Sequence, residues 1–401
     1  MDGHELIVEN LEDWDEDVTS ETALSVDPDE FFAKSAFRII YQTNNFFLPQ
    51  IRDLIEKGEV LNLRPEYQRR LRWSTPQKSR LVESLLLNIP IPPAFFYESN
   101  SARYEVIDGQ QRLNAVQEFI DGGFALTGLQ VLKPLNGLRY LRCPPRIKRA
   151  LDRSTLSAIV LLLESEPVSN RIGNLSLTDI RRFIFDRLNT GGTRLNAQEI
   201  RNAIYPGYFN KALVELSRFK TFTDTFDIPS YTEADPNDYY ENVERQKNNL
   251  YSSMSDCQLV LRYFTLKDDD NIRSSMKSML DRAMEQRVTI SENDAHILEE
   301  EFKQRFSFLY TLFDGKPFSL AHDDRGRNRV SAALYDASMV AMDRVWSKRD
   351  EIEKNKPAIK KRMAEVLSDQ AQLTILTGQG NTAKAVRNRI DLMKTVLTTI
   401  S

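Results

Sequence analysis

One short stretch near residue 108 places the strongest constraint on how this chain can fold. Residues 103–108 have strand-like character, Gly109 follows, and a helical pattern begins at once. That pattern recurs at helical spacing, at Leu113, Val116, Gln117 and Ile120. Gly122 and Gly123 end the run, as glycines after helices commonly do. The sequence therefore predicts a strand, a glycine turn and a helix in direct succession.

This turn has the chemistry of an anion site. The first N–H groups of a helix have no acceptor within the helix, and the helix dipole favours negative charge there. Arg112, one turn in, offers a forked donor for phosphate. Asp108 places a carboxylate at the same point, where it can hold a metal ion such as Mg²⁺ or orient water. A structural alternative is equally open at this stage, with Asp108 serving only as the helix N-cap.

Two further stretches extend the pattern. Residues 64–73 read Arg-Pro-Glu-Tyr-Gln-Arg-Arg-Leu-Arg-Trp, and residues 187–202 contain Asn-Thr-Gly-Gly-Thr followed by Gln-Glu-x-Arg. With Asp-Gly-Gln-Gln-Arg between them, these stretches resemble the GmrSD-type restriction proteins, domain-of-unknown-function family 262. That family has a ParB/sulfiredoxin-like fold, and the resemblance covers about residues 45–265. The resemblance implies a small mixed α/β domain that binds a nucleotide.

The resemblance also implies which side chains form the site. Gln68 and Arg69 would join Asp108 and Arg112 as catalytic residues. Two arginines from separate elements that converge on one helix N-terminus would form a phosphate clamp. The residues implied to bind the nucleotide are Gly109, Gln110, Gln111, Asn189, Thr190, Gly191, Gly192, Thr193, Gln198, Glu199 and Arg201.

The Gly-Gly joint at residues 189–193 has two readings. Glycines there can adopt positive φ, so that backbone N–H groups line an anion nest. Alternatively, the joint is a plain helix end with a glycine at C′. A new helix is predicted to begin at Asn196, with Glu199 at the capping-box distance. Glu199 and Arg201 are equally compatible with a structural ion pair.

Charge and composition limit the class of protein. Residues 1–30 contain twelve Asp or Glu and no Lys or Arg, a formal charge of −12. Because the whole chain has a net charge of −4, residues 31–401 carry +8. This pattern predicts a disordered acidic arm before a basic body that suits nucleic acid, although a merely solubilising tail is the alternative. The apolar run 158–163 is too short to span a membrane. Cys143 and Cys257 predict two reduced, buried thiols in a cytoplasmic protein.

The predicted fold class is α+β. A ParB/sulfiredoxin-like domain is expected in residues 31–207 and a predominantly α-helical domain in residues 208–401. Helices of the second domain are expected near 253–266, 271–286, 291–313, 330–350, 351–367 and 381–399. The basic stretches 348–362 and 387–394 are predicted to face DNA or a partner subunit, with a plainly solvated face as the alternative.

Several chemistries lack the residues they need. The chain contains no Gly-x-x-x-x-Gly-Lys-Ser/Thr phosphate loop. The stretch 378–383 imitates a dinucleotide fingerprint but lacks its βαβ setting. Only His4, His296 and His322 exist, too scattered for the HNH nuclease domain that larger proteins of the resembling group carry.

Two functional hypotheses follow. The first is an NTPase of bacterial phage defence that couples NTP hydrolysis, with Mg²⁺, to recognition or nicking of DNA. The second is a non-catalytic module that senses a nucleotide or modified DNA and regulates a partner effector. Both predict DNA and a nucleotide as partners, with a partner protein or homo-oligomer possible and no membrane.

Overall fold

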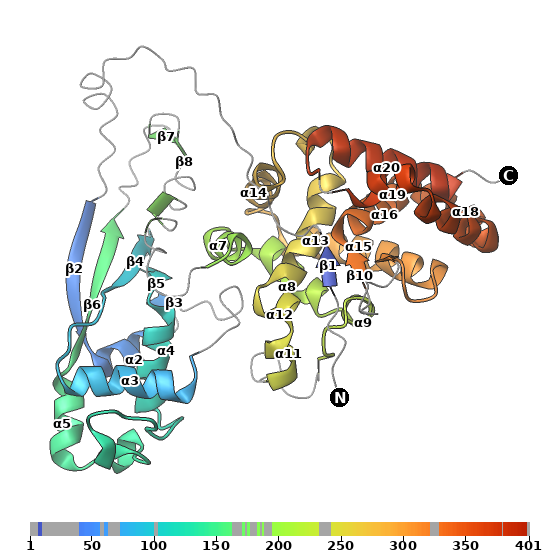
Figure 1. Cartoon of the computed structure of the whole chain (residues 1–401). Helices are drawn as coiled ribbons and strands as arrows, with labels where there is room; N and C mark the ends of the chain where they lie inside the picture. The colour runs from blue at the N-terminus through green and yellow to red at the C-terminus, as the bar shows by residue number, and fades with distance from the viewer. Residues whose placement is uncertain are drawn as a thin grey trace. The chain divides into compact units, whose positions relative to one another are not determined.

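The computed structural model describes residues 7–9, 40–56, 60–62, 73–99, 103–162, 171–172, 175–176, 183–184, 187, 195–231, 242–320, 329–378 and 380–398. The chain forms two compact units. One is Thr22–Leu195, and the other combines Met1–Glu21 with Asn196–Ser401. Figure 1 shows the helices and strands of both units.

A five-stranded mixed sheet organises the unit Thr22–Leu195. Its strands are β2 (Ile40–Phe47), β3 (Leu61–Asn62), β4 (Ala94–Ser99), β5 (Arg103–Asp108) and β6 (Thr155–Leu162). They lie in the order β2, β6, β4, β5, β3. β2 and β6 run antiparallel side by side (Figure 1), and β4 is antiparallel to β5. The pairs β4–β6 and β3–β5 are parallel. A separate pair, β7 (Arg171–Ile172) and β8 (Leu175–Ser176), is antiparallel.

Helices share a buried core with one face of this sheet. They are α2 (Leu48–Glu56), α3 (Thr75–Leu86), α4 (Gln110–Ile120) and α5 (Pro145–Arg153), with 3₁₀ turns η1 (Lys133–Leu135) and η2 (Tyr140–Arg142). Phe96, Val106 and Val160 of the sheet belong to the same buried cluster as Leu113 and Val116 of α4. The apolar spacing that predicted α4 is therefore the spacing of its core-facing side chains.

The second unit is built mainly from helices. They are α7 (Ala197–Ile204), α8 (Tyr208–Ser217), α9 (Lys220–Thr225), α11 (Val243–Lys247), α12 (Asn249–Ser252), α13 (Ser255–Leu266), α14 (Met276–Gln286), α15 (Glu292–Leu312), α16 (Ala332–Arg344), α17 (Arg349–Lys354), α18 (Lys356–Ser368), α19 (Gln370–Thr377) and α20 (Ala383–Thr398), with short 3₁₀ turns η3 (Asp269–Asn271) and η4 (Trp346–Lys348). α13 is buried from Asp256 to Leu266, and Phe222, Phe302 and Phe306 form an aromatic cluster. Deep in this unit Arg262 forms a bidentate ion pair with Asp336, at 2.5 and 2.9 Å. The predicted α+β class is confirmed.

A three-stranded sheet brings the start of the chain into the helical unit. β1 (Ile7–Glu9) pairs in parallel with β10 (Arg329–Ser331), which pairs antiparallel with β9 (Ser319–Leu320). This corrects the prediction of a disordered arm over residues 1–30, because three of its residues satisfy the hydrogen bonds of a strand edge. The rest of the predicted arm lies outside the described residues.

The boundary between the units lies earlier than the predicted division at residues 207 and 208. Asn196 is the first residue of the helical unit that continues to the C-terminus. The reason is that α7 joins that unit: Arg201 pairs with Asp281 of α14, and Asn196 binds the carbonyl of Ser253 at 2.7 Å.

Two smaller expectations have outcomes. Cys143 and Cys257 are buried thiols that form no disulfide in the described part of the chain, as predicted. In the part of the chain that the structure describes, no helix is both long enough and apolar enough to cross a membrane.

Candidate functional site

The turn from β5 into α4 has the predicted strand–glycine–helix form. Gly109 is the N-cap of α4 and has φ +97°, in the left-handed region that glycine tolerates best. The first helical bond runs from the N–H of Leu113 to the carbonyl of Gly109, at 3.0 Å. A Cβ on Gly109 would lie 2.8 Å from the Cβ of Ala94, at the start of β4. Glycine is therefore required here by both backbone conformation and space.

Arg112 holds this turn together. Its Nη1 donates to the carbonyls of Pro92 and Pro93, the second at 3.2 Å, and its Nη2 forms an ion pair with Asp108. The Arg112 side chain is 11% exposed, whereas that of Asp108 is 50% exposed. The guanidinium thus fixes the Asp108 carboxylate over the start of α4, in place of the outward clamp expected from the sequence. Nothing in the sequence indicated that the Pro92 and Pro93 carbonyls would accept these bonds.

Asp108 is the carboxylate that faces solvent at this turn. It does not cap α4, since Gly109 is the N-cap and no side-chain capping bond is formed there. Its Oδ2 bonds Arg112, and its Oδ1 makes no hydrogen bond within the described part of the chain. Mg²⁺ is commonly held by one or two carboxylates together with substrate phosphates. Among the described residues, no group of three His, Cys, Asp or Glu could hold a metal ion.

Gln68 and Arg69 lie outside the described residues, but both flanks of their segment are placed. On one side, Asn62 of β3 pairs with Glu105 of β5. On the other, the backbone N–H of Trp73 donates to Oε1 of Gln111 in the first turn of α4, at 3.0 Å. Asn62 and Trp73 therefore lie beside β5 and the first turn of α4, respectively.

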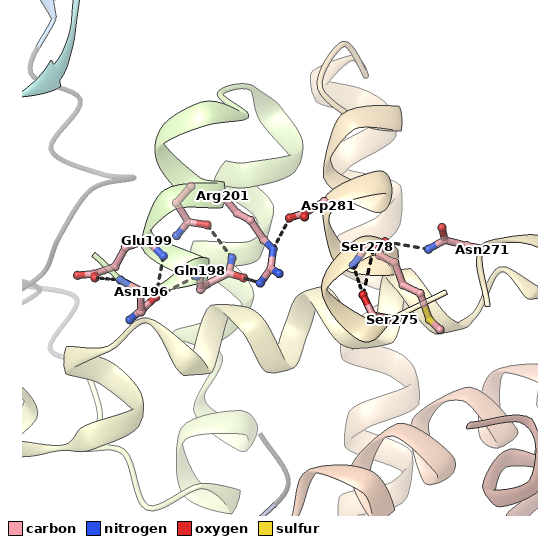
Figure 2. A network of polar contacts seen from close by, with 10 residues as sticks. Asn196, Gln198, Glu199, Arg201, Asn271, Ser275, Ser278 and Asp281 are labelled. Atoms are coloured by element: carbon pink, nitrogen blue, oxygen red, sulfur yellow. Dashed lines mark hydrogen bonds and ion pairs between the residues drawn. The ribbon is translucent and has the colours of Figure 1, made fainter. Parts of the chain in front are cut away.

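Gln198, Glu199 and Arg201 belong to the helical unit, where they are buried and bonded to neighbours (Figure 2). Asn196 and Glu199 form the predicted capping box of α7. Arg201 points toward Asp281 of α14, with Nε 2.8 Å from Oδ1 (Figure 2). Glu199 thus has a capping role and Arg201 pairs with Asp281, while the ion pair between Glu199 and Arg201 stays a prediction.

The amide groups of α7 continue this network. Nε2 of Gln198 donates to Oδ1 of Asn202 at 2.8 Å, and Nη1 of Arg201 donates to Oε1 of Gln198 at 3.4 Å. Asn210 of α8 in turn donates to the carbonyl of Asn202 at 2.8 Å. Gln198 and Arg201, two of the residues implied to bind a nucleotide, thus take part in a buried hydrogen-bond network within the helical unit.

The Gly-Gly joint, Asn189 to Thr193, lies outside the described residues, so both of its readings remain predictions. Just before it, the Arg187 guanidinium stacks on the Phe183 ring at 4.3 Å. Both residues are in helical conformation.

The chain was compared with models of protein families. Residues 51–206 match the family model described as the GmrSD restriction endonuclease, N-terminal domain. The matched range is shorter than the predicted resemblance and contains every residue assigned to the site. Comparison with curated proteins and with solved structures gave no match.

Proposed function

We propose that this chain, whose residues 51–206 are a GmrSD-type N-terminal domain, is a nucleotide-dependent component of DNA restriction in phage defence. The observation that carries the proposal is the turn at Gly109, which presents a half-exposed carboxylate at a helix N-terminus. A helix start of this kind suits the phosphates of an NTP. The family match supports DNA as the target and supports no particular nucleotide.

The proposed chemistry is hydrolysis of the terminal phosphoanhydride bond of an NTP. Water attacks the γ-phosphorus, the bond to the β,γ-bridging oxygen breaks, and NDP, phosphate and a proton are released. The N–H groups of the first turn of α4 would bind phosphate oxygens, and Gln68 and Arg69 would contact the same phosphates. Bound Mg²⁺ would neutralise phosphate charge, held in part by Asp108. Arg112 acts as a positioning residue that keeps Asp108 in place.

A second function has its own supporting observation. The guanidinium of Arg112, expected to clamp phosphate, already bonds two carbonyls and Asp108. Such a site can bind a nucleotide without turning it over, which suits a module that senses nucleotide or modified DNA for a partner effector. The two functions differ in phosphate release and agree on binding.

The test uses full-length protein with each NTP and Mg²⁺, with and without duplex DNA. Phosphate release, DNA nicking and nucleotide binding are measured for the wild type, for Asp108→Asn and for Asp121→Asn. Asp121 is the matched control, because it lies at the opposite end of α4 and pairs with Arg52 at 2.5 Å. Asp108→Asn should lower turnover by roughly 100-fold or more, the typical effect of losing one electrostatic contact to a transition state. Asp121→Asn should retain turnover.

Each outcome selects one reading. Binding of an NTP without phosphate release would favour the sensing module. Full turnover by Asp108→Asn, with the fold intact by circular dichroism, would contradict the assigned site.

A further inference from the structure

An exposed basic surface lies in the unit Thr22–Leu195, away from the turn at Gly109. Residues 133–153 contain seven Lys or Arg and a single Asp, a net formal charge of +6. Five arginines of this stretch are exposed: Arg139, Arg142, Arg146, Arg149 and Arg153. We call these five side chains the basic surface. The last three lie on one face of α5, at positions i, i+3 and i+7.

No neighbouring carboxylate neutralises this surface. Within the described part of the chain, no Asp or Glu lies within 4 Å of any of the five guanidinium groups. The one acidic residue of the stretch, Asp152, accepts a hydrogen bond from the hydroxyl of Tyr140. The charge is therefore available to a partner in solution.

The basic helices of the other unit differ in this respect. Residues 348–362 contain seven Lys or Arg but also three Asp or Glu, and Glu365 follows on the same helix. Five of these cations are paired: Arg349 with Asp350, Lys356 and Lys360 with Asp314, and Lys361 and Arg362 with Glu365. The face expected from sequence to meet DNA is thus largely self-neutralised, and the surface at α5 is the stronger candidate.

The scaffold under the basic surface is packed. Leu151, on the opposite face of α5, is 1% exposed in the core. Ser154, just after α5, accepts a bond from the N–H of Leu48 at 3.2 Å, and Arg139 donates to the carbonyl of Gly122 at 2.5 Å. The Tyr140 ring packs edge-on against Phe119 of α4, with ring centroids 6.0 Å apart. The arginines therefore project from a rigid support, which lowers the entropy lost on binding.

We propose that the basic surface binds the phosphate backbone of duplex DNA, independently of sequence. The three arginines on α5 span about 10 Å along the helix axis, a distance that covers several phosphates of a duplex. Guanidinium groups suit phosphate because their forked donors match its oxygens. The proposal rests on the proposed function for the choice of DNA, and it assigns the surface that holds DNA while the nucleotide occupies the start of α4.

The test compares two triple variants of the full-length protein. One carries Arg142→Gln, Arg146→Gln and Arg149→Gln. The control carries Arg349→Gln, Lys361→Gln and Arg362→Gln, which removes the same charge from cations that are paired with Asp350 or Glu365. Affinity for a duplex of mixed sequence is measured by fluorescence anisotropy without nucleotide, over a range of salt concentrations.

Loss of three phosphate contacts should weaken binding roughly 10- to 100-fold at low salt. The slope of log K against log salt should fall by about 2 to 3 in magnitude, since each contact contributes about 0.9. The control should change the slope by less than about 1. Equal losses in both triple variants, or unchanged binding by the first, would overturn the proposal.

Two further measurements distinguish DNA binding by the basic surface from the NTPase activity and from binding of an acidic peptide. Phosphate release without DNA should be the same in the first triple variant as in the wild type, so a missing NTPase activity leaves the DNA result interpretable. A synthetic peptide of residues 10–28, which is acidic, should compete poorly with DNA at equal charge. Efficient displacement of DNA by the peptide would overturn the proposal in favour of an acidic peptide as the occupant.

Discussion

Replacement of Gly109 by alanine tests whether the turn into α4 is built as described. Two costs add together. An L-residue with φ near +97° costs about 1–2 kcal/mol. The new Cβ would also lie 2.8 Å from the Cβ of Ala94, and crowding of this kind in a packed core costs about 1–3 kcal/mol. Gly109→Ala should therefore destabilise the turn by about 2–5 kcal/mol.

Gly122→Ala is the matched control for the backbone cost. Gly122 follows the other end of α4 with φ +79°, but its Cβ would meet nothing closer than 3.8 Å. It should lose only the conformational part, about 1–2 kcal/mol. The difference between the two variants isolates the contact with Ala94.

The measurement is hydrogen exchange of peptides from β4 and α4 in the full-length protein, read by mass spectrometry. Every 1.4 kcal/mol corresponds to about a tenfold faster exchange through local opening. A double-mutant cycle with Ala94→Gly should recover the crowding cost, because that change removes the nearest atom. Equal effects of the two glycine replacements, or a cycle without coupling, would refute the close approach of β4 to the turn.

Three other changes have defined outcomes. Glu83 is buried, which raises its pKa, but hydrogen bonds from the N–H groups of three consecutive residues outweigh burial, and its pKa is lowered. Glu83→Gln should cost about 2–4 kcal/mol near neutral pH in urea unfolding. The Glu83 carboxylate stabilises the fold above its unfolded pKa, and this contribution should vanish as pH falls through its lowered folded pKa. The difference in unfolding free energy between Glu83→Gln and the wild type should therefore shrink in acid. Arg201→Ala should cost about 3–5 kcal/mol by breaking its pair with Asp281, and loss of nucleotide binding without that destabilisation would instead support a nucleotide role. Deletion of residues 10–28, which leaves β1 in place, should tighten DNA binding at low salt and lose its effect at high salt; anisotropy that shows no change at low salt would count against it.

Local signals in the sequence were sufficient to predict the local structure. The strand, Gly109 and the helix after it were predicted from spacing and from one residue that tolerates positive φ. The capping box at Asn196 and Glu199 was predicted from two residues three positions apart, and it is present. Such features depend on neighbours in the chain, so a single sequence contains the information.

Long-range pairings were not predicted, because nothing in the sequence marks them. Arg112 finds its acceptors at Pro92 and Pro93, about twenty positions earlier, and a proline carbonyl leaves no signal in a sequence. The domain division was predicted at residues 207 and 208, whereas the Arg201–Asp281 pair, eighty positions apart, places α7 with the helices that follow. The strand β1 was not predicted because it lies within the acidic residues 1–30, and its partner β10 lies more than three hundred positions later.

Helix α4 bears on both proposed binding positions. Its first turn adjoins Asp108, and Phe119 near its end contacts Tyr140. A helix of 11 residues is about 16 Å long, so the two positions are separated by about that length. If nucleotide and DNA bind at opposite ends of one stiff element, their affinities form a closed thermodynamic cycle. The factor by which the nucleotide changes DNA affinity must then equal the factor by which DNA changes nucleotide affinity. A factor of one would make α4 a passive support, and any other value would make it the route by which a bound nucleotide reports that DNA has been engaged.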